Sequence, residues 1–213
     1  MTPDGDNSSA KITGYVLAGG GSTRFGKDKA LVEVGGKPML VRMCELLGTV
    51  ASGVTVIGDR EKYASLLFKC VADRWPGAGP LGGIITALEN AGTRKESPAW
   101  NLIVSCDMPF LTREWLAYLA EYAMKNSSQV TLPESAHGPE PLCACYRTDA
   151  EPALRAAFER GVRKITDALK QVTTEVLDEA HWKRFDSAGR LFWNMNTLAD
   201  YEVARRILGA EQK

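Results

Sequence analysis

The chain has 213 residues, a length that suits one α/β domain and can bury a core without disulfides or a structural metal. Lys and Arg together number 26, as do Asp and Glu, so the formal net charge is zero. This balance argues against a general nucleic-acid or anionic-membrane binder, because both need a basic surface. Glycine is the unusual component, with 20 residues, several of them gathered at positions 19–21, 26 and 35–36.

The N-terminal segment is acidic and polar, so it predicts neither a signal peptide nor a transit peptide. No apolar run approaches the ~20 residues that span a bilayer. We expect residues 1–11 to be a flexible tail and residues 12–213 to form a single domain of a cytoplasmic protein. The five cysteines lack CxxC spacing and predict reduced, mostly buried thiols. A metal or redox pair at Cys143 and Cys145 is the alternative, although no His or Cys cluster lies nearby in the sequence to complete it.

In chain order, β-prone apolar runs alternate with helical patterns over the first 125 residues. This alternation predicts a three-layer α/β/α fold with a mostly parallel, Rossmann-like sheet. The expected strands are 12–17, 31–34, 54–57, 69–72, 102–105, 129–132, 142–146 and 173–177. The expected helices are 38–47, 63–68, 81–90, 112–124, 150–160, 162–169 and 198–208. Ligands of such folds bind beyond the carboxyl ends of the strands, here after Leu17, Ala72 and Ser105.

A glycine-rich loop follows the first expected strand and reads LAGGGSTRFGKDK from Leu17 to Lys29. Its glycines let backbone N–H groups approach a phosphate, and Arg24, Lys27 and Lys29 add positive charge, so the loop could cradle a triphosphate. The Rossmann fingerprint fails because Arg24 stands at the third glycine position. The P-loop motif fails because Asp28 follows Lys27 where Ser or Thr would bind Mg²⁺. A flexible turn with solvated charges remains an alternative.

The pattern LAGGxSxRFGxDKAL over residues 17–31 resembles the signature loop of nucleotidyltransferases, and within them that of the molybdenum cofactor guanylyltransferases. Later segments resemble the same family in the same order. They are Asp73 with GPLGG at 79–83, CDMP at 106–109, PLCACY at 141–146 and NMNT at 194–197. The resemblance covers about residues 12–205 and implies the nucleotidyltransferase fold. Two departures are Phe25, where the family usually has Met, and Ile57, where it often has a nucleotide-contacting Asn.

The resemblance implies an enzyme that transfers GMP from GTP to molybdopterin, forms a guanine dinucleotide cofactor and releases pyrophosphate. Because the acceptor phosphate is already anionic, such a reaction needs positioning, cations and Mg²⁺ rather than a strong base. The implied partners are GTP and molybdopterin, with no nucleic acid or membrane, in a monomer or weak oligomer. Transient contact with proteins that deliver molybdopterin or mature molybdoenzymes is also implied.

Two alternative functions remain open at this point. One is a cytidylyl- or sugar-phosphate nucleotidyltransferase that carries the same loop. The other is a non-catalytic nucleotide-binding protein, against which the intact Lys29 and Asp107 argue.

The resemblance also implies roles for individual residues. Asp107, after a buried strand, is expected to hold Mg²⁺, with a helix cap as its structural alternative. Asn196 is expected to join the metal site, and a local Asx turn is the alternative for it and for Asn194. Lys29 would neutralise the triphosphate, and Arg24 would assist at its β- and γ-phosphates. The expected nucleotide contacts are Leu17, Ala18, Gly19, Gly20, Lys29, Asp73, Gly82 and Asp107.

The acceptor pocket is predicted only by position, with walls around residues 140–146 and 163–167. Arg163 and Lys164 could bind the acceptor phosphate or could be exposed helix charges. His137 and His181 are expected to lie on the surface.

Overall fold

The computed structural model describes residues 12–19, 28–93 and 99–210 of the chain. The predicted tail, and Gly20, Arg24 and Lys27 of the glycine loop, lie outside these residues. One eight-stranded sheet runs through the molecule in the order β10-β7-β9-β6-β1-β4-β5, with β8 paired to β7. Its strands are β1 (Thr13–Ala18), β4 (Val54–Gly58), β5 (Cys70–Val71), β6 (Trp100–Ser105), β7 (Val130–Ser135), β8 (Gly138–Pro139), β9 (Cys143–Arg147) and β10 (Thr174–Leu177).

The sheet is mostly parallel, as predicted. β1 lies at its centre, parallel to both β4 and β6, and β5 continues the parallel order beyond β4. β9 runs antiparallel to β6 and to β7. Only residues 136–142 separate β7 from β9, which is too short for the crossover that a parallel pair requires.

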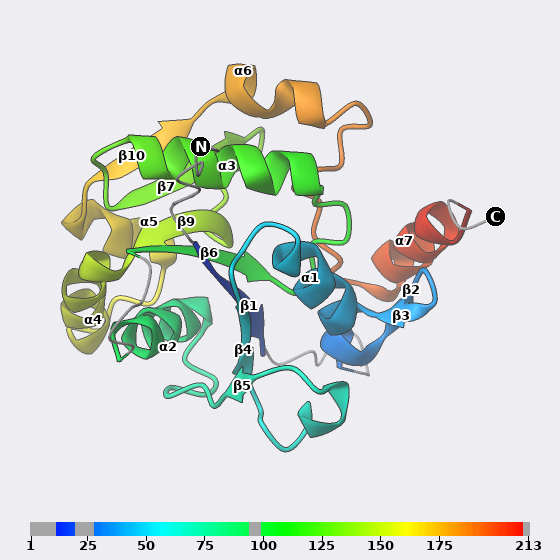
Figure 1. The fold of residues 1–213 in the computed structure, drawn as a ribbon, viewed down its shortest axis with the longest axis horizontal. Helices are drawn as coiled ribbons and strands as arrows, with labels where there is room; N and C mark the ends of the chain where they lie inside the picture. The colour runs from blue at the N-terminus through cyan, green and yellow to red at the C-terminus, as the bar shows by residue number, and fades with distance from the viewer. Residues whose placement is uncertain (1–11, 20–27, 94–98, 211–213) are drawn as a thin grey trace, which may run out of the picture.

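Helices cover both faces of the sheet (Figure 1). The helices are α1 (Met39–Gly48), α2 (Pro80–Gly92), α3 (Arg113–Lys125), α4 (Glu151–Glu159), α5 (Ile165–Ala168), α6 (Glu179–Trp182) and α7 (Leu198–Ala210). Side chains of β1 alternate between the two faces: Val16 packs in the core with α1 and α3, whereas Tyr15 packs in the core with α2 and α4. Burial on both faces explains why β1 reads as a continuous apolar run rather than an alternating one.

Several predicted elements are shorter than expected. The predicted helix 63–68 is only a 3₁₀ turn at Ala64–Leu66, because Leu67 adopts a left-handed φ of 60° that ends it. The predicted helix 162–169 is reduced to α5 and a following 3₁₀ turn, Leu169–Gln171. β8 and α6 were not predicted. None of the described helices is long and apolar enough to cross a membrane.

The thiols behave as predicted: all five cysteines are free and four are buried. Burial raises the pKa of the Cys143 thiol to about 12, and the described residues contain no cluster of three or more His, Cys, Asp or Glu that could hold a metal. His137 is exposed as expected. His181 also lies at the surface, partly covered by the Tyr122 ring at 5.5 Å, and its Nδ1 lies 2.7 Å from Oδ1 of Asp178.

Candidate active site

The carboxyl ends of β1, β4, β5 and β6 meet at one edge of the sheet. A cleft of about 950 Å³ opens there, the size of a small-molecule site. It is lined by Ala18 and Gly19 after β1, by residues 58–64 after β4, and by Asp73 and Gly79 between β5 and α2. Two of the three strand-end loops singled out from the sequence therefore face one cavity.

The first turn of α2 faces this cleft through Gly79 and Pro80. Gly79 has a φ of +91°, which a residue with a Cβ rarely adopts, and Pro80 is the first helical residue. Pro80 has no N–H and the N–H of Gly82 donates to the Gly79 carbonyl, so it is mainly the dipole of this 13-residue helix that favours an anion at its N-terminus.

Asp107 follows β6 at the same edge. The Ser105 hydroxyl donates a hydrogen bond of 2.6 Å to its Oδ1, and the N–H of Met195 donates one of 2.8 Å to its backbone carbonyl. Thr112 caps α3 by accepting from the N–H of Trp115. Asp107 therefore does not serve as that helix cap, and its second carboxylate oxygen faces other partners.

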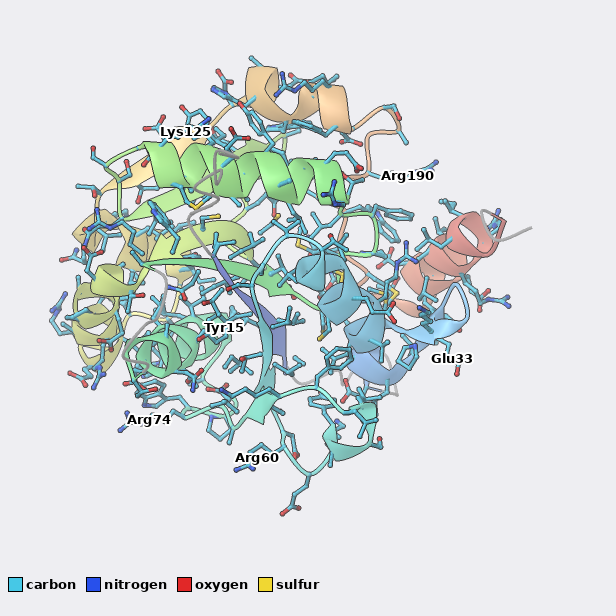
Figure 2. The ribbon with its side chains drawn as sticks, in the orientation of Figure 1. Tyr15, Glu33, Arg60, Arg74, Lys125 and Arg190 are labelled. Carbon is cyan, nitrogen blue, oxygen red and sulfur yellow. The ribbon has the colours of Figure 1, made fainter. Side chains whose placement is uncertain are left out.

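Lys29 lies between Asp107 and a second partner, Asn196 (Figure 2 draws the side chains of the described residues). Its Nζ donates a hydrogen bond of 2.9 Å to Oδ1 of Asn196 and lies 3.6 Å from Oδ2 of Asp107. Only 17% of the Lys29 side chain and 19% of the Asp107 side chain are exposed, so this contact is screened less than a surface pair. Three residues that the sequence analysis placed in the site, far apart in the chain, thus meet at one point.

Asn196 is held in place by the start of α7. The Asp200 carboxylate accepts hydrogen bonds from the N–H groups of Asn196 (2.9 Å) and Thr197 (2.7 Å), and the Thr197 hydroxyl accepts from the N–H of Asp200. This reciprocal arrangement is a capping box. Burial raises the pKa of the Asp200 carboxyl, but these hydrogen bonds and the Lys29 charge lower it further, to below its usual value.

Asp28 fixes the backbone that carries Lys29. Its Oδ1 accepts from the N–H of Ala30 and caps the 3₁₀ turn Lys29–Leu31, while its Oδ2 accepts from the Tyr63 hydroxyl at 2.9 Å and pairs with Lys62. Burial raises the pKa of the Asp28 carboxyl, but these three partners together lower it below its usual value. Asp28 therefore stays ionised at neutral pH.

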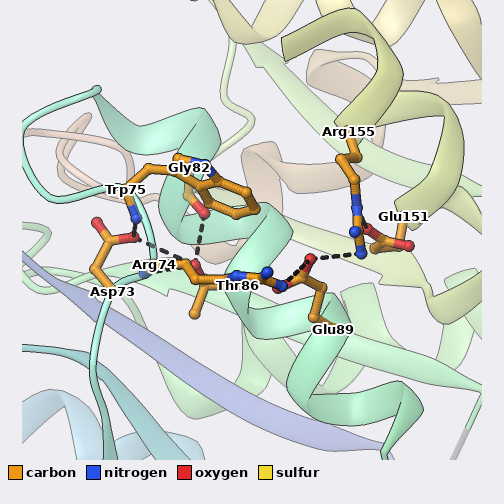
Figure 3. A network of polar contacts seen from close by, with 8 residues as sticks. All are labelled: Asp73, Arg74, Trp75, Gly82, Thr86, Glu89, Glu151 and Arg155. Carbon is orange, nitrogen blue, oxygen red and sulfur yellow. Dashed lines mark hydrogen bonds and ion pairs between the residues drawn. The ribbon is translucent and has the colours of Figure 1, made fainter. Parts of the chain in front are cut away.

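Asp73 is held by a polar network between β5 and α2 (Figure 3). Its Oδ1 accepts from the N–H of Trp75 at 3.0 Å and lies 3.2 Å from the Thr86 hydroxyl. That hydroxyl also lies 2.9 Å from the carbonyl oxygen of Gly82 and accepts from the N–H of Arg74. Asp73 is thus more than a polar strand end: one oxygen is tied to the loop and to α2, and the residue lines the cleft.

Ion pairs continue this network to α4. Glu89 accepts from Arg74 at 3.0 Å and pairs with Arg155, which also pairs with Glu151 (Figure 3). Partly exposed pairs contribute little stability one by one, but they link the loop after β5 to two helices. The Trp75 ring also packs on Phe158 of α4, with ring centroids 5.3 Å apart.

Other predicted contacts are placed differently. The Leu17 carbonyl already accepts from the N–H of Cys106, and its side chain packs under the cleft. Gly82 also lies below the cleft, where an added Cβ would approach Trp75 to 3.2 Å. Ile57 is buried in the core, so no polar contact comes from that position. The Asn194 amide donates to the Phe192 carbonyl at 3.2 Å, two residues back in the chain, so its contact is local but is not the expected Asx turn.

The sequence analysis missed the supporting residues Ser105, Thr86, Tyr63 and Asp200. The Thr197-x-x-Asp200 spacing is a capping-box signature that could have been recognised. Nothing local indicates the contacts of Tyr63 with Asp28 or of Thr86 with Asp73, since each joins residues that only the fold brings together.

Comparison with known proteins assigns the family. Residues 14–173 match the family model described as "MobA-like NTP transferase domain". A "Probable molybdenum cofactor guanylyltransferase" of Carboxydothermus hydrogenoformans is 31% identical over 201 residues, covering 94% of this chain and 98% of that protein. A protein of the same name from Pelotomaculum thermopropionicum is 34% identical over 198 residues, covering 92% of each chain. The crystal structure of "Molybdopterin-guanine dinucleotide biosynthesis protein A" from Archaeoglobus fulgidus superimposes with a TM-score of 0.79 at 26% identity, covering 95% of this chain and 100% of that one. Together with the cleft and the Lys29, Asp107 and Asn196 cluster, these matches show that the chain belongs to the MobA-like NTP transferase family and, within it, to the molybdenum cofactor guanylyltransferases.

Proposed function

We propose that this enzyme transfers GMP from GTP to the terminal phosphate of molybdopterin. A phosphate oxygen of the acceptor forms a bond to the α-phosphorus, the bond from that phosphorus to the β-phosphate oxygen breaks, and pyrophosphate leaves with the electron pair. The observation that carries the proposal is the position of the Lys29 ammonium between Asp107 and Asn196, beside a cleft of mononucleotide size.

Some residues of the site bind the nucleotide, and others neutralise the negative charge of the reacting phosphates. The positive end of the α2 dipole and the backbone at Ala18 and Gly19 face the nucleotide, and Asp73 binds its nucleoside part. Lys29 offsets the negative charge that two approaching anions bring together, which is where enzymes gain most of the rate of such transfers. The nucleophile is anionic from the start, so the site needs no strong base.

The same residues fit Mg²⁺. Asp107 and Asn196 present a carboxylate and a carboxamide oxygen, both hard donors, and these already converge on one cationic group, the Lys29 ammonium. Mg²⁺ needs only one or two carboxylates because phosphate oxygens and water complete its shell. When bound, the ion would stabilise the charge that develops on the leaving pyrophosphate. GTP as the donor, the Mg²⁺ requirement, the cytoplasmic location and the transient protein partners stay predictions.

The nucleotide preference separates this proposal from the cytidylyl- or sugar-phosphate nucleotidyltransferase alternative. Thermal unfolding with Mg²⁺ and each of GTP, CTP, ATP and UTP should give the largest rise in Tm with GTP, since only a ligand that binds the native state stabilises it. A larger rise with CTP would overturn the guanylyl assignment.

Ser105 orients the metal-binding carboxylate, and we expect Ser105→Ala to lower kcat roughly tenfold and to raise the Mg²⁺ concentration for half-maximal rate. A hydrogen bond to a charged group is worth about 1.5–3 kcal/mol, and each 1.4 kcal/mol is a factor of ten. Ser105→Thr keeps the hydroxyl and should restore the metal dependence. Equal metal dependence in the alanine variant and the wild type would contradict this role.

Thr86 positions Asp73, and Thr86→Val should raise the KM for GTP about tenfold with little change in kcat. The substitution preserves shape but removes the hydroxyl that joins Asp73 to the Arg74 N–H. Steady-state kinetics with Thr86→Ser as the matched control tests this. If both variants, or neither, show the raised KM, the positioning role is wrong.

A further inference from the structure

The acceptor needs a place of its own beside Asp107. Arg163, which the sequence analysis offered for the acceptor phosphate, instead donates to the Phe158 carbonyl and lies over the Phe158 ring. The nucleotide cleft is lined by loops after β1, β4 and β5 and by the start of α2, and its volume suits one mononucleotide. Two other segments adjoin Asp107: the loop from β6 to α3, and the chain that leads into α7. The hydrogen bond from the Met195 N–H to the Asp107 carbonyl, 2.8 Å long, holds these two segments together.

Each of these segments carries a half-buried aromatic ring. Phe110 and Trp193 pack against each other with ring centroids 5.5 Å apart and ring planes inclined by 51°. Phe110 stands three residues after Asp107, and Trp193 stands three residues before Asn196. Three residues span at most about 10 Å, so the backbone of each ring lies within that distance of a residue of the reaction centre.

An arginine lies beside this aromatic pair. The N–H of Trp193 donates to the Arg190 carbonyl at 2.9 Å, closing a turn, and the Arg190 guanidinium lies 6.0 Å from the centre of the Phe110 ring. Among the residues that the structure describes, no carboxylate pairs with this guanidinium. Figure 2 shows Arg190 at the outer edge of the molecule, between α3 and α7 in that view. The Asp186 carboxylate accepts from the Arg190 backbone N–H at 2.7 Å, whereas the guanidinium group is available to an anionic ligand at the rim.

We propose that Trp193 and Phe110 form a stacking platform for the flat heterocycle of the acceptor, a pterin that carries a phosphate ester, with Arg190 facing its anionic groups. Stacking of a nucleic-acid base on an aromatic side chain is worth about 1–3 kcal/mol, and a pterin offers a similar π-face. Both rings already pack against the buried core, so little side-chain freedom is lost on binding. The platform places the pterin within reach of Lys29 and Asp107 for its phosphate. This inference rests on the proposed function.

The platform contributes to acceptor binding and not to the nucleotide site, which gives it a kinetic signature. Trp193→Ala should raise the KM for molybdopterin about tenfold or more, with the KM for GTP and the kcat close to wild type. Trp193→Phe keeps a ring and should restore most of the affinity. Arg190→Gln should raise the acceptor KM by a smaller factor that shrinks as salt is added.

Phe185→Ala is the matched control, because Phe185 is another half-buried ring packed against the same core, on Trp115 and Tyr118. It should lower Tm to a similar extent as Trp193→Ala without raising the acceptor KM. If Trp193→Ala and Phe185→Ala raise that KM equally, or neither raises it, the platform is wrong. If Trp193→Ala fails to fold, the acceptor KM of Arg190→Gln and the fluorescence titration described below still test whether the platform binds the pterin.

A direct reading comes from tryptophan fluorescence. Titration with 6-hydroxymethylpterin phosphate should quench the wild-type emission, and Trp193→Phe should lose a large part of that saturable quenching. Unchanged quenching in Trp193→Phe would overturn the platform. This titration needs no GTP transfer, so quenching through Trp193 in an enzyme that transfers nothing to molybdopterin would contradict the proposed function and leave the pterin site standing.

Discussion

Replacing Asp107 with asparagine should abolish GMP transfer and leave the fold intact. Asparagine retains an oxygen that can accept the Ser105 hydrogen bond, but it removes the charge that faces Lys29 at 3.6 Å and that Mg²⁺ requires. Losing one preorganised electrostatic partner of a transition state costs about 10²–10³-fold in kcat, and losing the metal costs more. We therefore expect kcat to fall at least about 10³-fold, measured as pyrophosphate release with GTP, molybdopterin and Mg²⁺.

Asp149→Asn is the matched control for this variant. Asp149 is an exposed carboxylate that pairs with Arg147. Arg147 lies opposite Trp100 at the start of β6, whereas Asp107 follows the end of that strand, so Asp149 is remote from the site. It should keep wild-type kcat, and Asp107→Asn should keep a Tm close to wild type. More than a tenth of wild-type activity in Asp107→Asn would refute its assignment as the metal-binding residue.

Replacing Lys29 with glutamine should lower kcat/KM for GTP by about 10²-fold or more. Glutamine can still donate to Asn196, so the variant isolates the loss of positive charge from the loss of a hydrogen bond. That charge offsets the repulsion between the triphosphate and the acceptor phosphate in a site where little solvent screens it. Lys29→Arg should recover part of the activity, because a guanidinium keeps the charge but not the compact shape of an ammonium.

The control for Lys29 is Lys125→Gln, an exposed lysine at the end of α3 that pairs with Glu121. Steady-state kinetics of the three variants should show the loss only at position 29. A Lys29→Gln enzyme with wild-type kcat/KM for GTP would exclude the role in charge neutralisation, whatever its Tm.

Most strands and helices of the first 125 residues could be predicted because their signals are local; the exception is the expected helix 63–68, which is only a 3₁₀ turn. Thr112 caps α3 as its sequence position indicates, and Asp107 and Asp73 lie at the strand ends where an α/β sheet binds ligands. Predicted strand ends agree with the structure within one or two residues for β1, β4 and β6. The parallel core follows from the alternation of strand and helix alone.

The antiparallel position of β9 and the contacts that orient the site could not be predicted in the same way. The β7–β9 connection is irregular in sequence, so its direction emerges only from the pairing of β9 between β6 and β7. The Lys29–Asn196 hydrogen bond joins residues separated by 167 positions, and Tyr63 reaches Asp28 across 35. The motif resemblance predicted Lys29, Asp107 and Asn196. The residues that hold them in place could not be predicted, because tertiary packing brings them to the site.

Transfer of labelled nucleotide tests the central claim most directly. The purified enzyme is incubated with molybdopterin, Mg²⁺ and either α-labelled GTP or α-labelled CTP, and the dinucleotide product and pyrophosphate are quantified. The account predicts one GMP attached per molybdopterin and one pyrophosphate released, with GTP strongly preferred. Transfer of CMP at an equal or higher rate, or no transfer of GMP to intact molybdopterin, would contradict it.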